Sequence, residues 1–111
     1  VSNHPALVQS LEPTVVVMNN GPKKGGLPGT LDAIAATKSV QALYQIHQSY
    51  NVPPERNAPA AFVANHDNLT GADAAKCPAN LIKMSVAPDG KSYTVSIPAN
   101  GQSKTYQTKT K

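Results

Sequence analysis

Thr14-Val15-Val16-Val17-Met18-Asn19 is the stretch that decides the fold. Its consecutive β-branched residues favour a strand over a helix. A short apolar run without polar alternation is typical of a strand that is covered on both faces, as the strands of parallel sheets are. The turn-forming residues from Asn19 to Pro22 end it. The sequence therefore predicts a strand over residues 14–19 within a parallel sheet.

A helix is expected ahead of this strand. Ser2 or Asn3 can accept hydrogen bonds from the first-turn amides, and Pro5 suits the first helical position. Pro13 disfavours helical geometry at Glu12 and so sets the end of the helix. The apolar residues between these limits share one face: Leu7, Val8 and Leu11.

A loop, a second helix and a second strand are expected after residues 14–19. The stretch from Gly21 to Thr30 carries four glycines and two prolines, which is typical of a loop. Thr30 is expected to cap the helix, with Asp32 in its first turn. Residues 42–47 indicate the second strand. This order over residues 1–50 implies a right-handed crossover that joins two parallel neighbours.

Residues 51–80 lack a clear period and are expected to form a long irregular surface loop. Val52-Pro53-Pro54 and Pro59 favour extended, non-helical backbone at its start. We expect one helical turn at residues 60–64, around Phe62. The remainder, from residue 65 onwards, is polar and rich in alanine.

Residues 81–111 predict an antiparallel β-meander. Tyr93, Val95 and Ile97 alternate with polar residues, as in a half-buried strand. Pro88-Asp89-Gly90 indicates a turn, and Asn100-Gly101 is the preferred dipeptide of a type I′ hairpin. Strands are expected at 81–86, 93–97 and 104–108, the last at an edge protected by lysine. The expected fold class is therefore α/β with α+β character: a helix–strand–helix–strand unit followed by a meander.

The composition allows one small domain or a piece of one. Of the 111 residues 5% are aromatic and none is tryptophan, so the core is expected to be marginal and completed by missing sequence or by a partner. The net charge of +4 comes from lysine, since Arg56 is the only arginine. Without arginine clusters and stacking aromatics, nucleic-acid binding is not expected. No apolar run of about 20 residues indicates a membrane helix.

The glycine-rich loop invites a comparison with phosphate-binding loops. Gly21 and Gly26 have P-loop spacing, with Lys23 and Lys24 between them. A P-loop requires Lys and then Ser or Thr after the second glycine, but Leu27 and proline stand there. Weak anion binding and a plain strand-to-helix connection both remain open, and the plain connection is preferred.

The chain carries a few side chains that are borderline or soft metal ligands. Zinc sites usually place two ligands a few residues apart, and no pair here has such a spacing. Cys77 is alone, so no internal disulfide forms, and no serine lies in a nucleophile elbow. We expect no self-contained metal or catalytic site from the following residues: His4, His47, His66, Asp67 and Cys77.

Several stretches together resemble the C-terminal part of bacterial metallo-β-lactamase-fold hydrolases of the competence-protein-like (ComEC-like) branch. The resemblance covers most of the chain and is weakest between residues 57 and 80. The stretches that carry it are Ser2-Asn3-His4-Pro5-Ala6-Leu7-Val8, Val17-Met18-Asn19-Asn20-Gly21-Pro22-Lys23-Lys24-Gly25-Gly26, Leu43-Tyr44-Gln45-Ile46-His47 and Lys83-Met84-Ser85-Val86-Ala87-Pro88-Asp89-Gly90-Lys91-Ser92-Tyr93-Thr94-Val95.

The resemblance implies a structural portion of a metal-dependent hydrolase. In that family a His-x-His-x-Asp-His cluster and later histidines hold one or two metal ions, commonly zinc, which generate a hydroxide nucleophile. Those motifs would lie upstream of Val1, so no metal ligand is carried over to any residue, His4 included. The implied partners are the missing N-terminal part of the fold or a second copy. The loop over residues 21–30 would approach the active-site rim, and an exported or periplasmic parent is expected.

Two other functions are compatible with the sequence to different degrees. One is a small stand-alone binding module that uses the Lys23/Lys24 loop or the edge of the meander as its contact surface. The other is an intact small enzyme, which is disfavoured because no site is recognisable. A large exposed apolar patch or self-association favours the hydrolase portion, whereas a monomer that unfolds cooperatively favours the module.

Overall fold

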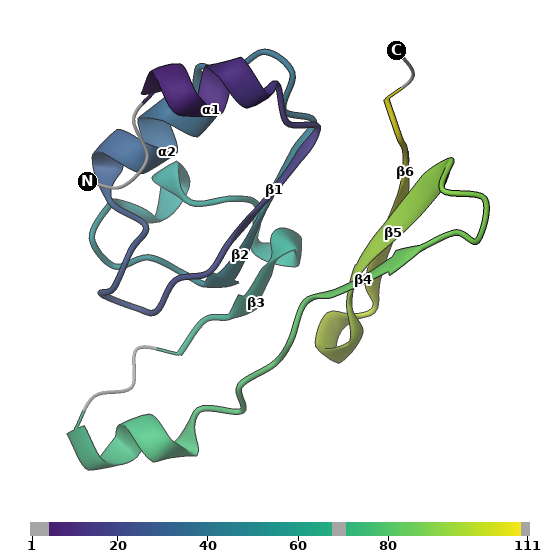
Figure 1. Ribbon diagram of the computed structural model, residues 1–111. Helices are drawn as coiled ribbons and strands as arrows, with labels where there is room; N and C mark the ends of the chain where they lie inside the picture. Colours follow the sequence, from purple (N-terminus) through teal and green to yellow (C-terminus); the bar gives the residue numbers. More distant parts are fainter. Residues whose placement is uncertain (1–4, 68–70, 110–111) are drawn as a thin grey trace.

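The computed structural model describes residues 5–67 and 71–109, and it has mixed α/β architecture, as the sequence predicted. A parallel three-stranded sheet of order β1-β2-β3 packs beside an antiparallel three-stranded sheet of order β4-β5-β6. The helices cover the face of the parallel sheet that is turned away from the second sheet (Figure 1). The elements are α1 (Pro5–Leu11), β1 (Val15–Met18), α2 (Pro28–Ala35), β2 (Ala42–His47), β3 (Val63–Asn65), β4 (Lys83–Val86), β5 (Ser92–Ile97) and β6 (Gln102–Gln107).

The core lies between the two sheets. Tyr44 on β2 is fully buried; its ring stacks on Phe62 with centroids 4.8 Å apart. Its hydroxyl shares a hydrogen bond of 2.7 Å with the hydroxyl of Tyr106 on β6. Val95 and Ile97 on β5 are also fully buried and belong to the same cluster. The alternation predicted for residues 93–97 is therefore the feature that joins the meander to the parallel sheet.

The prediction that β1 is covered on both faces is wrong. No residue of β1 is fully buried, and 46% of Val17 is exposed. β1 also lies at the edge of its sheet. The parallel pairing itself is confirmed, with Val15 beside Ala42 and Val17 beside Tyr44. The apolar run therefore has the composition of a central strand, which pairs with a strand on each side. Among the described residues, however, β1 pairs with one strand only.

The predicted cap at Thr30 is also wrong, because α2 begins two residues earlier, at Pro28. Proline favours the first helical position, since its φ angle is already helical and it has no amide hydrogen to satisfy. Leu27 occupies the capping position without a side-chain hydrogen bond, and Thr30 is buried inside the helix. The caps proposed for α1, Ser2 and Asn3, lie outside the described residues.

Residues 51–67 and 71–80 contain more secondary structure than the sequence predicted. They contain the third parallel strand, β3, in which Val63 pairs with Gln45 and Asn65 with His47. Three residues are too few to display a period, so tertiary pairing rather than local pattern defines this strand. The predicted helical turn is confirmed as a 3₁₀ turn at Ala60–Phe62, and two others lie at Pro54–Arg56 and Gly71–Lys76.

One of the two turns of the meander differs from its prediction. Residues 98–101 connect paired Ile97 and Gln102 through a 3₁₀ turn, with Gly101 at φ 74°, so the connection is not a two-residue type I′ turn. Pro98 accounts for this geometry because it suits the first position of a helical turn. The turn before β5 is confirmed by the 2.9 Å bond from the Gly90 amide to the Ala87 carbonyl. The edge position of β6 is confirmed as well.

Candidate functional site

Buried polar side chains gather where the parallel strands end. In open α/β sheets, ligands bind outside the carboxyl ends of parallel strands. β1, β2 and β3 end at Met18, His47 and Asn65. Four buried polar residues lie at or just beyond these ends, and Gln45 lies two residues before the end of β2: the four are Asn20, His47, Ser49 and Asn65. This carboxyl edge is the candidate functional site.

Asn20 ties the end of β1 to the end of β2. Its amide nitrogen donates to the His47 carbonyl at 2.8 Å, and its amide oxygen accepts from the His47 backbone amide at 3.3 Å. The residue is 6% exposed. A side chain that satisfies both backbone groups of His47 acts as a continuation of the strand pairing beyond Met18.

Asn57 forms a second buried network with Gln45 and Ser49. Its amide oxygen accepts from Gln45 Nε2 at 2.8 Å and from the Ser49 backbone amide at 2.7 Å. Gln45 in turn accepts from the Ala58 amide at 2.6 Å. The side-chain amides of Asn57 and Gln45 therefore form hydrogen bonds within the protein. They stabilise the segment after β2 and are not free to bind a ligand.

Asn65 and Asn80 join the two ends of the long segment between β3 and β4 by hydrogen bonds. Asn65 donates to the Asn80 carbonyl at 2.9 Å and accepts from the Asn80 amide at 2.8 Å. Asn80 also donates to the Ala64 carbonyl at 3.1 Å. The 3₁₀ helix Gly71–Lys76 within this segment projects away from both sheets (Figure 1), and the hydrogen bonds of Asn65 and Asn80 join the two ends of the segment at the carboxyl edge.

The loop that carries Lys23 and Lys24 is held by its carbonyl groups. The carbonyl oxygens of residues 22–26 each accept a hydrogen bond, from donors on residues 21 and 49–51. Asn51 Nδ2 contributes two of them, to Lys23 at 3.0 Å and to Gly25 at 2.9 Å. In a trans peptide the carbonyl and the following amide point in opposite directions. The amides of residues 23–27 therefore point away from the groups that hold the loop.

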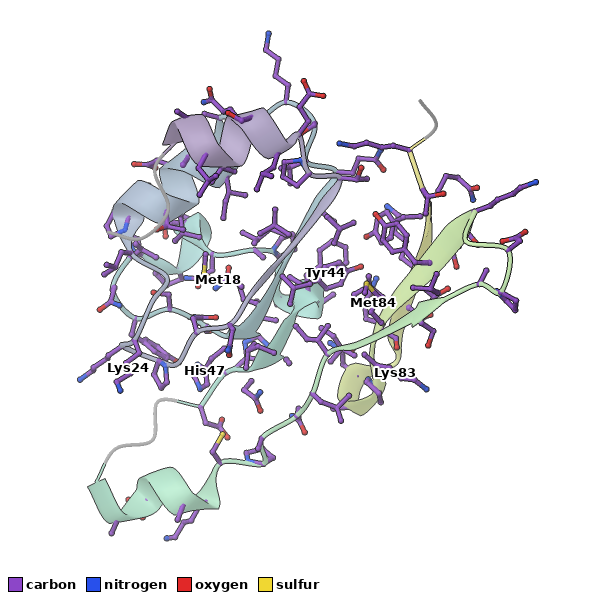
Figure 2. All side chains as sticks on the ribbon, in the orientation of Figure 1. Met18, Lys24, Tyr44, His47, Lys83 and Met84 are labelled. Carbon is purple, nitrogen blue, oxygen red and sulfur yellow. The ribbon has the colours of Figure 1, made fainter. Side chains whose placement is uncertain are left out.

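Two glycines give this loop its path. Gly25 and Gly26 have φ angles of 73° and 58°, a region that favours glycine. A Cβ atom on Gly26 would lie 2.6 Å from Ser49 Cβ, while Ser49 Oγ donates to the Gly26 carbonyl at 2.7 Å. The loop is consequently fixed against the residue that follows β2, with exposed Lys23 and Lys24 at its tip. Figure 2 shows Lys24 and His47 at this end of the sheet.

The residues weighed as metal ligands are not brought together. His47 is 5% exposed, and its Nδ1 lies 2.8 Å from the Gln48 carbonyl. His66 is exposed, with Nδ1 3.3 Å from the Gln48 side-chain oxygen. Asp67 is exposed and Cys77 half-buried, whereas His4 lies outside the described residues. Within residues 5–67 and 71–109, no three His, Cys, Asp or Glu side chains form a metal-binding group.

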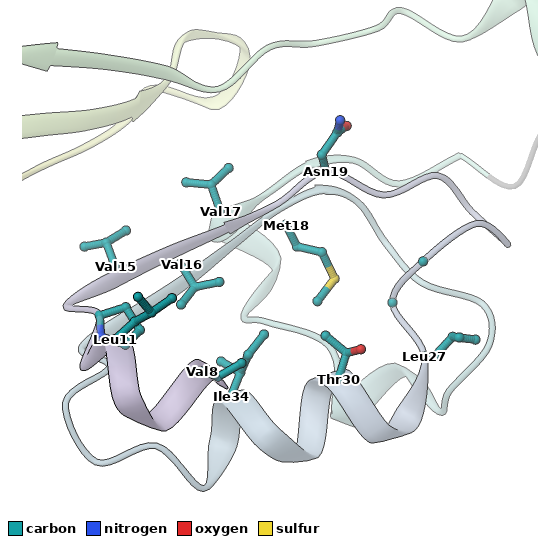
Figure 3. A pocket seen from close by; sticks show the side chains of 13 residues that line it. Val8, Leu11, Val15, Val16, Val17, Met18, Asn19, Leu27, Thr30 and Ile34 are labelled. Atoms are coloured by element: carbon teal, nitrogen blue, oxygen red, sulfur yellow. The ribbon is translucent and has the colours of Figure 1, made fainter. Parts of the chain in front are cut away.

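A cavity of about 500 Å³ lies beside β1, on the helix side of the parallel sheet (Figure 3). Val16 and Met18 point into it from the strand, and Val8 and Ile34 face it from α1 and α2. Asn19, Gly25, Gly26 and Thr30 also line it, with the Asn19 side chain pointing away from the helices (Figure 3). The cavity thus runs from an apolar floor between the helices to the glycine-rich loop at the carboxyl edge.

Comparisons of the chain with protein-family models, with curated proteins and with solved structures found no match. Across the part of the chain that the structure describes, no helix has the length and apolar character needed to cross a membrane.

Sequence reasoning missed the network of amide side chains. The signal was the repeated Asn, Gln and Ser just after the strands, at Asn20, Gln48, Ser49 and Asn51. Such residues are also common in plain turns. Their convergence depends on the pairing of β1, β2 and β3, which residue type alone does not reveal.

Proposed function

We propose that this chain is the C-terminal structural portion of a zinc-dependent hydrolase of the metallo-β-lactamase fold, and that it does not catalyse by itself. The observation that carries the proposal is the unfinished parallel sheet. β1 has the composition of a central strand, yet within the described residues only β2 pairs with it, and an apolar cavity lies beside it. A sheet that stops at its most apolar strand is typical of a domain that continues in further sequence.

The surface area supports the same proposal. The accessible surface is 6967 Å², whereas a folded monomer of this mass exposes about 5,800 Å². The excess of about 1,100 Å² compares with the ~800 Å² that each partner buries in a standard interface. The projecting 3₁₀ helix Gly71–Lys76 contributes part of the excess (Figure 1). The apolar side chains around β1 contribute another part, with Leu11 68% and Val17 46% exposed.

The layering supports it further. Helices, parallel sheet and second sheet follow one another in that order, which corresponds to an outer layer and the two facing sheets of an αβ/βα sandwich. In the proposed parent, zinc would be held by residues upstream of Val1. The glycine-rich loop at the carboxyl edge would border the active site, where the two exposed lysines meet an anionic substrate group.

The test compares this chain with the polypeptide of its complete reading frame. Both are incubated with zinc, desalted, and assayed for bound metal and for hydrolysis of phosphodiester, β-lactam and thioester substrates. We expect metal and hydrolysis in the longer polypeptide and neither in the chain alone. One zinc retained tightly by the chain alone, or a reading frame without the His-x-His-x-Asp-His motif, overturns the proposal.

A second candidate is a stand-alone module that binds an oxyanion at the Lys23/Lys24 loop. The observation that favours it is the orientation of the loop, whose carbonyls are all engaged while its amides point away. Successive outward amides beside two lysines form the kind of concavity that binds anions. Titration with inorganic phosphate, followed by amide chemical shifts of residues 23–27, tests it. Binding that is lost in Lys23→Ala/Lys24→Ala and kept in Lys83→Ala supports this candidate; unchanged shifts exclude it.

A further inference from the structure

The open edge of β1 retains unpaired backbone groups. The Thr14 carbonyl accepts the Gln41 amide at 2.7 Å, so the backbone groups of Thr14 face β2. Backbone groups of successive strand residues point to opposite edges, and those of Val15 and Val17 therefore point away from β2. Within the described residues, β2 is the neighbour of β1 on one side and no strand lies on the other. A free, apolar edge of this kind is a template for strand pairing.

The helix layer extends beyond that edge. α1 packs against α2 on the same face of the sheet. Its Val8 and Leu11 line the cavity together with Val16 and Ile34. Figure 3 shows both helices on one side of β1, with the space between them and the strand left open. The two helices thus extend past the open edge of β1. One more strand at that edge would pack against the part of the helix layer that β1 does not cover.

The hand of the fold determines where that strand comes from. Parallel strands connected through a helix form right-handed crossovers in about 98% of cases. The connection from β1 through α2 leads to β2, and α1 covers the same face as α2. A right-handed crossover through α1 consequently places the strand that precedes α1 on the other side of β1, at its open edge.

We propose that the open edge of β1 receives a parallel strand from the polypeptide that leads into α1. Alternate side chains of this strand fill the cavity between Val8, Leu11 and Ile34, so they are apolar. Those between them lie beside Val15 and Val17, on the face turned to the second sheet, because parallel neighbours share the orientation of their side chains. The strand order becomes one added strand followed by β1, β2 and β3.

The test uses hydrogen exchange of the Val15 and Val17 amides in this chain and in the polypeptide of the complete reading frame. We expect fast exchange in the chain alone at concentrations where it is monomeric, and at least 100-fold slower exchange in the longer polypeptide, with nuclear Overhauser contacts of a parallel strand. Equal exchange rates in both, or protection by an antiparallel strand, overturns the inference. Protection in the longer polypeptide that appears only because two of its copies associate, seen as a doubled mass, overturns it too.

Proline variants give an independent check on the edge. Val17→Pro removes an amide that faces the open edge, whereas Val16→Pro removes one that faces β2. In the longer polypeptide Val17→Pro should abolish protection at Val15 and leave the pairing of β1 with β2 intact. Protection at Val15 that survives Val17→Pro contradicts the inference. Val16→Pro should instead expose amides of β1 and β2 in the chain alone.

This inference rests on the part of the proposed function that makes the chain a portion of a larger fold, and the two fail separately. Strand protection without bound zinc or hydrolysis leaves the added strand in place and refutes the hydrolase. If the longer polypeptide hydrolyses a substrate while the Val15 and Val17 amides still exchange freely, the proposed hydrolase function is kept. The added strand is then refuted.

Discussion

At the scale of single residues, Gly26 shows why the loop has one path. It combines a φ of 58° with a distance of 2.6 Å between its would-be Cβ and Ser49 Cβ. Gly26→Ala should lower the free energy of unfolding by about 2–4 kcal/mol, from left-handed backbone strain and overpacking together. Urea denaturation measures this. Gly29→Ala is the matched control because nothing lies within 4 Å of its Cβ position; it should change stability by less than about 1 kcal/mol. Equal effects of the two variants would contradict this account.

Tyr44 gives the molecule a dependence on alkaline pH. Burial, followed by the hydrogen bond to Tyr106, raises the pKa of the Tyr44 hydroxyl above its usual value. The unfolded chain releases this proton near pH 10, while the folded chain still holds it, so stability is complete below that pH and falls as pH rises further. Thermal unfolding between pH 8 and 11 measures the fall. Tyr44→Phe should flatten the decline; an equally steep decline in this variant would show that other groups cause it.

At the scale of elements, sequence reasoning succeeded where the pattern is local. The alternation at 93–97 and the apolar run at 15–18 were sufficient to predict β5 and β1. β3 was missed because three residues carry no period and gain their extended form by pairing with β2. The start of α2 was missed because proline outweighs a threonine cap. The sequence also did not reveal the amide network, since its members meet only once the strands have paired.

The segment between Asn65 and Asn80, which connects β3 to β4, should be dispensable for folding. Asn65 and Asn80 join its ends by hydrogen bonds of 2.9 and 2.8 Å. Replacing residues 67–78 with a short glycine–serine linker should therefore shift the melting temperature by no more than about 4 °C, because shortening a surface loop changes closure entropy by under 1 kcal/mol. The Asn65→Ala variant is the contrast, and it should lose about 1–3 kcal/mol by leaving buried backbone groups unpaired. Unfolding of the linker variant would mean that the segment itself supports the sheets.

At the scale of the whole molecule, the open side of β1 predicts self-association of the isolated chain. Leu11 and Val17 are exposed by 68% and 46% beside the cavity, and such a patch next to a free strand edge favours contact between copies. Sedimentation equilibrium should show dimers or larger species in the range of 10–100 μM, which corresponds to an association free energy of about 5.5–7 kcal/mol.

Charge placed at this patch should suppress the association. Leu11→Lys/Val17→Lys should weaken it at least tenfold, because pairing at the edge would bury the new charges. Leu81→Lys is the matched control, since Leu81 is 57% exposed but lies in the segment before β4. If the control weakens association equally, general hydrophobicity rather than the edge of β1 is responsible. A wild-type chain that stays monomeric and unfolds cooperatively throughout this range would favour the stand-alone module over the hydrolase portion.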